Sequence, residues 1–205
     1  MLDLLALAAA CAPGVAPATM VAVVRAESHG DPLRIGVNRS LPPAAPPADR
    51  DAAIRQARAL IAAGADIDLG LAQINSGNLV WLGLPVERAF EPCANLRAAS
   101  VVLSLCYERA LRDHAAGQPA LQAALSCYNT DSLWRGFANG YVQKVVSGSA
   151  TYVPAIDPAY PVPPAAPAAR PATDGIVLRP HTASPPPRAV HQGKVLLLYG
   201  TPPAR

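Results

Sequence analysis

The sequence lacks the features that mark several large classes of protein. It has no apolar stretch long enough to cross a membrane. None of its four cysteines forms a C-x-x-C pair, and no histidine stands where it would complete a zinc pattern. Positions 1–150 carry 12 basic and 12 acidic residues without a Lys/Arg stripe. These absences argue against a transmembrane segment and a nucleic-acid partner, and they suggest neither a metal nor a cofactor.

Proline is distributed unevenly along the chain. Of the 23 prolines, 13 lie between Tyr152 and Pro203, where proline alternates with alanine. Such a composition cannot bury enough apolar surface to fold, and only the strand-like stretch Lys194–Tyr199 (KVLLLY) interrupts it. We therefore expect a folded domain over residues 1–150 and a disordered Pro/Ala-rich tail over residues 151–205. The net charge of +3 belongs to the tail, which has five basic and two acidic residues.

The first 150 residues show the apolar spacing and the end signals of helices. No convincing strand pair appears, and residues 66–75 (DIDLGLAQIN) have the mixed pattern of a buried loop. The fold class is therefore all-α. The expected helices are Leu2–Cys11, Pro17 to about Gly30, Asp51 (as the cap) to Gly64, Asn75–Trp81, Asn95–Ala116, Pro119–Asn129, and a last one capped by Asp131 or Ser132 with Phe137, Tyr141 and Val145 on one face.

The cysteines all lie within the first domain. An even number without metal spacing favours two disulfides and an oxidising compartment over buried thiols. In a hairpin about Gly117, Cys106 and Cys127 would lie roughly 17 and 13 Å from the turn, at similar heights. Of the three possible connectivities, this favours Cys106–Cys127 together with Cys11–Cys93.

One carboxylate is placed where it could do chemistry. Met20, Val23, Val24 and Glu27 fall at i, i+3, i+4 and i+7, so Glu27 continues the apolar face of its helix. Gly30 and the proline that follows end the helix and leave Glu27 in the last turn, beside a loop. A carboxyl in such a partly apolar site is a candidate general acid. A solvent-facing or Arg-paired glutamate is the alternative that this helix alone leaves open.

Three separated motifs occur in a recognisable order. They are Glu27-Ser28, then residues 70–75 (GLAQIN), then Tyr128-Asn129. In this order they resemble the goose-type lysozyme and lytic transglycosylase superfamily. With GVN at residues 36–38 and D-x-G-L-x-Q-I-N at 68–75, the chain also resembles the peptidoglycan-cleaving subunit of type IV secretion machines. Ala72 and Cys127 depart from the commoner Met and Ala, which bears on subsite shape rather than on chemistry.

The resemblance implies a lysozyme-like domain that cleaves the β-1,4 bond between N-acetylmuramic acid and N-acetylglucosamine. Glu27 would be the single catalytic acid and base, and the product would carry a 1,6-anhydro end. The residues that would hold the glycan or Glu27 are Ser28, Gln73, Asn75, Tyr128 and Asn129. Two aspartates of the motif region, Asp66 and Asp68, are read as loop hydrogen-bonders rather than as a second catalytic carboxylate.

The resemblance also implies a location and partners. The protein would act in the periplasm on peptidoglycan glycan strands, and its tail would contact other type IV secretion subunits. An export signal is not evident, because Asp3 replaces the expected positive charge and no A-x-A cleavage site is clear. Two alternatives remain open: a muramidase that uses water, and a catalytically silent scaffold that binds the wall.

Overall fold

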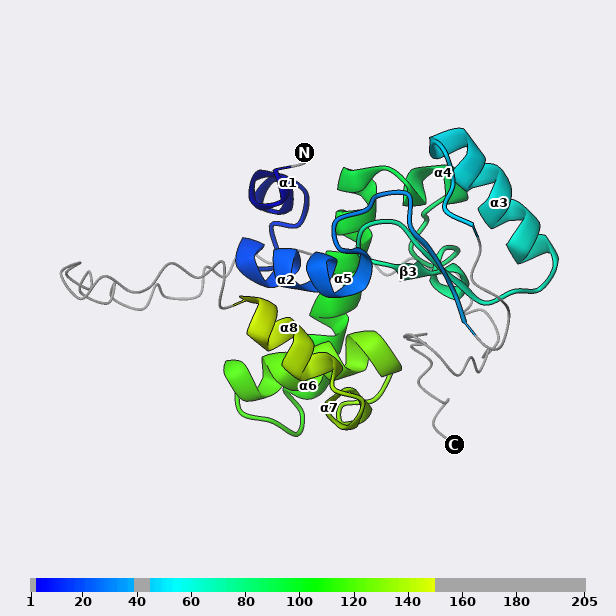
Figure 1. Ribbon diagram of the computed structural model, residues 1–205. Coiled ribbons are helices and arrows are strands. Elements are labelled where there is room, and N and C mark those ends of the chain that lie inside the picture. Colours follow the sequence, from blue (N-terminus) through cyan, green and yellow to red (C-terminus); the bar gives the residue numbers. More distant parts are fainter. Residues whose placement is uncertain (1–2, 39–44, 150–205) are drawn as a thin grey trace, which may run out of the picture.

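The computed structural model describes residues 3–38 and 45–149. The expected tail and its KVLLLY stretch lie outside the described residues, so the division at residue 150 stays a prediction. Helices dominate, and a small antiparallel sheet lies to one side of the long helix α5 (Figure 1). The elements are α1 (Leu4–Cys11), α2 (Pro17–Ser28), β1 (Ile35–Val37), α3 (Arg50–Ala62), β2 (Ile67–Leu69), β3 (Ile74–Asn75), the 3-10 helix η1 (Ser76–Asn78), α4 (Val86–Ala89), α5 (Pro92–Ala110), α6 (Gln118–Thr130), α7 (Arg135–Ala138) and α8 (Tyr141–Ser149).

The first two helices follow the sequence signals closely. The side chain of Asp3 accepts hydrogen bonds from two N–H groups of the first turn of α1, so this residue acts as a cap. Pro17 opens α2, where its missing N–H costs nothing. At the other end of α2, His29 and Gly30 both adopt a left-handed conformation, with φ of 59° and 90°. The expected end of the Glu27 helix is thereby confirmed, with His29 sharing the left-handed turn.

The sheet corrects the expectation of a buried loop at residues 66–75. Within the described residues β2 pairs with both β1 and β3, with Ile35 opposite Leu69 and Leu69 opposite Ile74. These strands have only two or three residues, which is too short for an alternating pattern to be visible in the sequence. The class remains helical, with the sheet as a small addition. The turn between β2 and β3 carries Gln73, so the sheet also positions part of the candidate site.

Several helix boundaries also differ from those expected. Asp49 rather than Asp51 caps α3, since its carboxylate accepts the N–H of Ala52 at 2.7 Å. The helix α5 ends at Ala110 instead of residue 116. All residues from 111 to 119 are exposed, and a helix that packs against nothing gains little from continuing. Asn75 does cap a short helix, but that helix is the single 3-10 turn η1.

The last predicted helix is two helices. A turn at Asn139 and Gly140 separates α7 from α8, and Gly140 has a φ of 78°. Tyr141 and Val145 are buried as expected, whereas Phe137 is 47% exposed. The hydroxyl of Ser132 accepts the N–H groups of Trp134 and Arg135, so one of the two proposed caps does act at this point.

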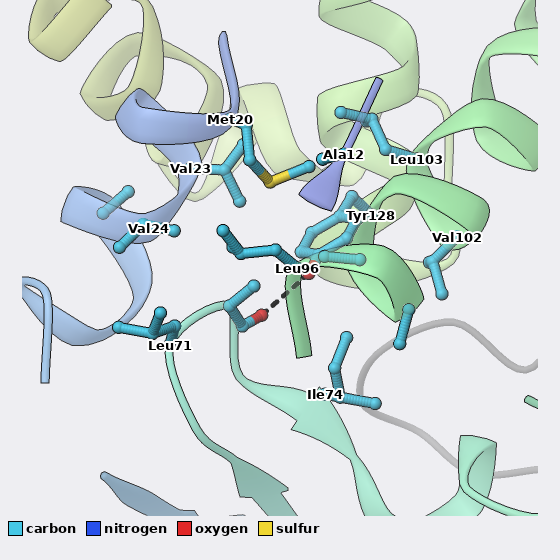
Figure 2. Close-up of a cluster of buried hydrophobic side chains, with 14 of the residues drawn as sticks. Ala12, Met20, Val23, Val24, Leu71, Ile74, Leu96, Val102, Leu103 and Tyr128 are labelled. Carbon is cyan, nitrogen blue, oxygen red and sulfur yellow. Dashed lines mark hydrogen bonds between the residues drawn. The ribbon is translucent and has the colours of Figure 1, made fainter. Parts of the chain in front are cut away.

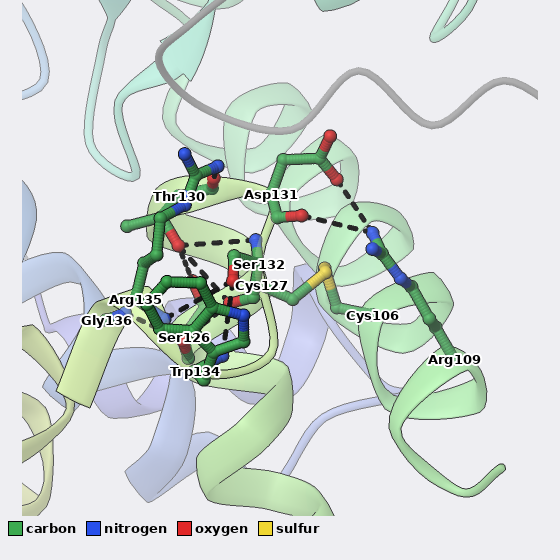
Figure 3. Close-up of a disulfide and its surroundings, with 10 residues drawn as sticks. All are labelled: Cys106, Arg109, Ser126, Cys127, Thr130, Asp131, Ser132, Trp134, Arg135 and Gly136. Atoms are coloured by element: carbon green, nitrogen blue, oxygen red, sulfur yellow. Dashed lines mark hydrogen bonds and ion pairs between the residues drawn. A yellow bond between two sulfur atoms is a disulfide. The ribbon is translucent and has the colours of Figure 1, made fainter. Parts of the chain in front are cut away.

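One continuous apolar core joins the helices to the inner side of the sheet. Both expected disulfides are present: Cys11 is bonded to Cys93, and Cys106 to Cys127. The first ties α1 to the start of α5. The second fastens α5 to α6 beside the ion pair of Arg109 and Asp131 (Figure 3). Across residues 3–38 and 45–149, no helix is both long and apolar enough to cross a membrane.

Candidate active site

Glu27 lies in the last turn of α2, half-buried, where the helix meets the rest of the helical region. Buried aliphatic side chains precede it on the same helix, among them Val23 and Val24. Its carboxylate Oε1 accepts a hydrogen bond from the hydroxyl of Tyr141 at 2.8 Å. A carboxyl held in this way, partly out of water and in one orientation, is suited to exchanging a proton with a bound molecule.

Tyr141 is a site residue that the sequence analysis missed. Its spacing predicts only a place on the apolar face of the last helix, 114 residues away from Glu27 in the sequence. Burial raises the pKa of the Tyr141 hydroxyl well above its usual range, and the nearby charge of Glu27 raises it further. One signal could have indicated the role: a tyrosine on an otherwise apolar buried face needs a partner for its hydroxyl.

Tyr128 connects the helical region to the turn of the sheet. Its ring lies within the apolar core, and its hydroxyl donates to the backbone oxygen of Ala72 at 2.7 Å (Figure 2). Burial is the main reason that the pKa of Tyr128 is raised, with smaller contributions from the negative charges of Glu27 and Asp68. Tyr128 therefore stays protonated and fixes the turn beside Glu27.

Gln73 occupies the turn between β2 and β3 in a left-handed conformation, with a φ of 51°. Its side-chain amide donates to the backbone oxygens of Gly70 and Arg34 at 2.9 and 3.1 Å. A Cβ atom on Gly36 would lie 2.6 Å from the Oε1 of Gln73, so a larger residue at this position would displace the Gln73 side chain. Gln73 is buried, and its amide joins the turn to the chain just before β1.

The turn has a second anchor, Asn95, whose role the sequence did not reveal. Its side chain is fully buried; the amide donates to the backbone oxygens of Leu69 and Ala89, and its Oδ1 accepts the N–H of Ala72. A Cβ on Gly70 would lie 2.5 Å from the Asn95 amide nitrogen, so glycine is required at that point. From the sequence, Asn95 is expected only to begin a helix.

The two aspartates of the motif region belong to a polar network on the sheet. The amide of Asn75 donates to Asp66 at 2.6 Å and to Asp68 at 3.1 Å. The amide of Asn38 donates to the other oxygen of Asp68. The oxygen of Asn75 accepts the N–H of Gly77 and caps η1. This network supports the expected reading of both aspartates as loop hydrogen-bonders.

The two remaining predicted site residues lie at helix ends. The hydroxyl of Ser28 donates to the oxygen of Val24 and accepts the N–H of Gly30, so it closes the end of α2. The Oδ1 of Asn129 accepts a hydrogen bond at 2.8 Å from the amide of Asn139, in the turn between α7 and α8. The same turn leads directly to Tyr141.

A cation and a cavity complete the surroundings of α2. The ammonium of Lys144 donates to the backbone oxygen of Ala26 at 2.6 Å, where the negative end of the helix dipole favours a positive charge.

A cavity of about 380 Å³ lies near the other end of α2, lined among others by Thr19, Leu103 and Tyr107, and it includes none of the predicted site residues. No three His, Cys, Asp or Glu side chains of the described segments converge in a way that could hold a metal ion.

The chain has a helical domain with Glu27 at a helix end and Gln73 in a turn beside it, and this combination places it in a known class of protein. The chain belongs to the transglycosylase SLT domain family, whose family model matches residues 5–142. It is similar to the type IV secretion system protein VirB1 of Brucella suis biovar 1, with 41% identity over 157 residues that cover 73% of this chain and 65% of the relative. The protein VirB1 of Agrobacterium tumefaciens is 39% identical over 152 residues, 71% of this chain and 60% of that protein.

The chain therefore spans less than two thirds of the length of these curated relatives. No solved structure matches it significantly.

Proposed function

We propose that the protein is a lytic transglycosylase that cleaves the β-1,4 bond between N-acetylmuramic acid and N-acetylglucosamine in peptidoglycan and leaves a 1,6-anhydro end. Membership of the transglycosylase SLT domain family supports the reaction class. The observation that carries the proposal is the half-buried carboxylate of Glu27, held at 2.8 Å by the hydroxyl of Tyr141.

Glu27 serves first as an acid and then as a base. Its proton passes to the glycosidic oxygen as the bond to C1 breaks, while the 2-acetamido oxygen of the substrate bonds to C1 and stabilises the positive charge. The Glu27 carboxylate then takes the proton of the 6-hydroxyl as that oxygen attacks C1 and displaces the acetamido oxygen. The acid is regenerated, no water is added, and no second carboxylate is needed.

The hydroxyl of Tyr141 keeps the Glu27 carboxylate in one orientation through both steps, and Tyr128 and Gln73 fix the turn beside it. We assign Ser28, Gln73, Asn75, Tyr128 and Asn129 to holding the glycan or the site around it. Of these, the half-exposed Asn129 is best placed for direct contact with sugar. Ser28 and Asn75 act through the backbone that they cap.

The relatives named as type IV secretion proteins suggest the setting. We propose that the protein acts in the periplasm and opens the wall locally for such a machine. The two disulfides support an oxidising compartment.

We further propose that residues 151–205, outside the described part of the chain, contribute to binding other secretion subunits and are dispensable for cleavage. A protein that ends at residue 150 should release muropeptides from isolated wall as fast as the full chain does. Loss of cleavage by a normally folded truncated protein would contradict this boundary.

Digestion of purified sacculi, followed by mass analysis of the released muropeptides, tests the proposed reaction. The products should carry 1,6-anhydro ends, about 18 Da lighter than hydrolysed ends, because no water enters the bond. Reducing ends would instead assign the protein as a hydrolytic muramidase. A folded protein that binds sacculi but releases nothing would assign it as a silent scaffold.

A further inference from the structure

Two aromatic side chains on and beside α7 lie at the surface of a chain that has few of them. The whole sequence has two tryptophans and two phenylalanines. Phe90 is buried in the core, whereas Trp134 is 69% exposed and Phe137 is 47% exposed. Rings of this size normally contribute to a core, so two exposed rings three residues apart indicate a contact surface.

The backbone that carries these rings is held firmly. The hydroxyl of Ser126 accepts the N–H of Gly136 at 2.8 Å, and a Cβ on Gly136 would lie 2.6 Å from the Ser126 Cα. The guanidinium of Arg135 donates to the backbone oxygen of Thr130. Figure 3 shows this set of bonds between α6 and α7, with Trp134 beside it. The close packing leaves α7 little freedom to turn the rings inward.

The same short segment is continuous with the candidate active site. Asn139, two residues after Phe137, donates to Asn129 at 2.8 Å and accepts the backbone N–H of Tyr141 at 3.0 Å. Tyr141 in turn donates to Glu27. The run Trp134–Tyr141 thus presents two exposed rings, the Asn139 amide and the hydroxyl that binds the carboxylate, and Asn139 links it to the amide of Asn129 in α6.

We propose that Trp134 and Phe137 form a stacking platform for N-acetylated sugar rings of the glycan strand, next to the bond that Glu27 cleaves. The inference rests on the proposed function for the identity of the ligand. A pyranose ring has an apolar C–H face that covers an aromatic ring, while its hydroxyl and acetamido groups need donors and acceptors such as the Asn129 and Asn139 amides. The platform binds sugars beside the cleaved bond and so sets affinity rather than the rate of the chemical step.

Binding can be measured apart from cleavage in a Glu27→Gln background. The probe is a hexamer of N-acetylglucosamine, titrated by calorimetry against the full chain at low and at high salt. Trp134→Ala and Phe137→Ala should each weaken binding about tenfold, the size of effect seen when a ring stacked on an aromatic side chain is lost. Trp134→Phe should recover most of the affinity, and salt should change little because the sugar is uncharged. Leu111→Ala, which removes an exposed apolar side chain outside the site, is the matched control.

In the cleaving enzyme, the alanine variants should raise KM for soluble glycan strands and leave kcat unchanged. Unchanged affinity and KM in the Trp134→Ala Phe137→Ala double variant, folded by circular dichroism, would overturn the platform. Loss of binding to a secretion subunit with intact sugar binding would assign the rings to a protein partner and overturn it as well. Hexamer binding that depends on Trp134 in a chain that releases no muropeptide would support the platform and contradict the proposed cleavage.

Discussion

Glu27 and Asp68 both contribute negative charge near the buried hydroxyl of Tyr128, yet the two regions that hold them differ. On the helical side, α2 presents Glu27 half-buried at its end, where the hydroxyl of Tyr141 donates to its Oε1. On the sheet side, the amides of Asn38 and Asn75 bind both oxygens of Asp68. A carboxylate whose two oxygens are both bound to amides of the same sheet is suited to holding the backbone in place.

The comparison also explains why the sheet side has so many polar groups. The side-chain amides of Gln73 and Asn95 donate to backbone oxygens, and the amide of Asn75 donates to an aspartate. Buried polar groups of this kind fix one backbone conformation, because each would cost free energy if left without a partner. A dense polar network therefore marks the scaffold of the site, whereas the proposed chemistry is assigned to Glu27 at the end of α2.

The contrast between Glu27 and Asp68 depends most on Glu27 being the catalytic acid and base. Glu27→Gln keeps the shape of the side chain but removes the proton that must reach the leaving oxygen. Help from a general acid or base is worth about 10²- to 10⁴-fold. Here one group acts in both steps, so muropeptide release should fall by about 10⁴-fold or more, while the melting temperature stays close to that of the parent. Near-normal release from a folded variant would sink the mechanism.

Removing the Cys106–Cys127 disulfide, next to Tyr128, tests how much this bond contributes to the stability of the helical side. Replacing Cys106 and Cys127 together by alanine opens a link between residues 21 positions apart. The free energy of unfolding should fall by about 3 kcal/mol, since the unfolded chain regains the entropy that the loop had lost. Urea unfolding monitored by circular dichroism measures the change. A midpoint equal to that of the parent would mean that packing alone holds α5 on α6.

Tyr141→Phe tests the helical side more finely, because it removes only the hydroxyl that donates to Glu27. A hydrogen bond to a charged group contributes about 1.5–3 kcal/mol, so cleavage should fall by about tenfold to a hundredfold as Glu27 loses its fixed orientation. The pKa of Tyr141 lies well above its ordinary range, so the hydroxyl stays protonated throughout the working pH range. Ionisation of Tyr141 should therefore produce no step in the rate of the parent on the alkaline side up to about pH 9. An alkaline step that the parent shows and the Tyr141→Phe variant lacks would indicate that Tyr141 itself exchanges a proton.

The parts of this arrangement that the sequence predicted are those with a repeating pattern. The apolar spacing from Met20 to Glu27 was enough to place Glu27 at a helix end, and the rise per residue of two helices was enough to pair Cys106 with Cys127. The resemblance carried by residues 70–75 implies a site role for Gln73, which stays a prediction, and the structure places Gln73 in the turn between β2 and β3. In each case the information lies within one helix, one hairpin or one short motif.

The parts that could not be predicted depend on contacts between distant segments. Strands of two or three residues show no alternation, so the sequence predicts a buried loop at residues 66–75, where β2 and β3 lie. Nothing near Tyr141 in the sequence indicates that its hydroxyl reaches Glu27. The sequence does not indicate the break between α7 and α8 at Asn139 and Gly140, because Phe137, Tyr141 and Val145 keep helical spacing across it. Only the structure shows that Phe137 lies at the surface.

The smallest effect is expected on the sheet side, at Asp68. Asp68→Asn removes the negative charge but keeps a side chain of the same shape that can still accept from the Asn38 or Asn75 amide. If Asp68 is a scaffold residue, cleavage should fall by less than about tenfold, and the loss should come with a lower melting temperature, since hydrogen bonds to charged groups contribute more to stability than neutral ones. If Asp68 were instead a nucleophile or a base, removal of its charge would reduce the rate as severely as Glu27→Gln does and leave stability unchanged. Measuring rate and melting temperature on both variants side by side separates the two roles. A large loss of rate in a stable Asp68→Asn protein would require a second carboxylate in the mechanism.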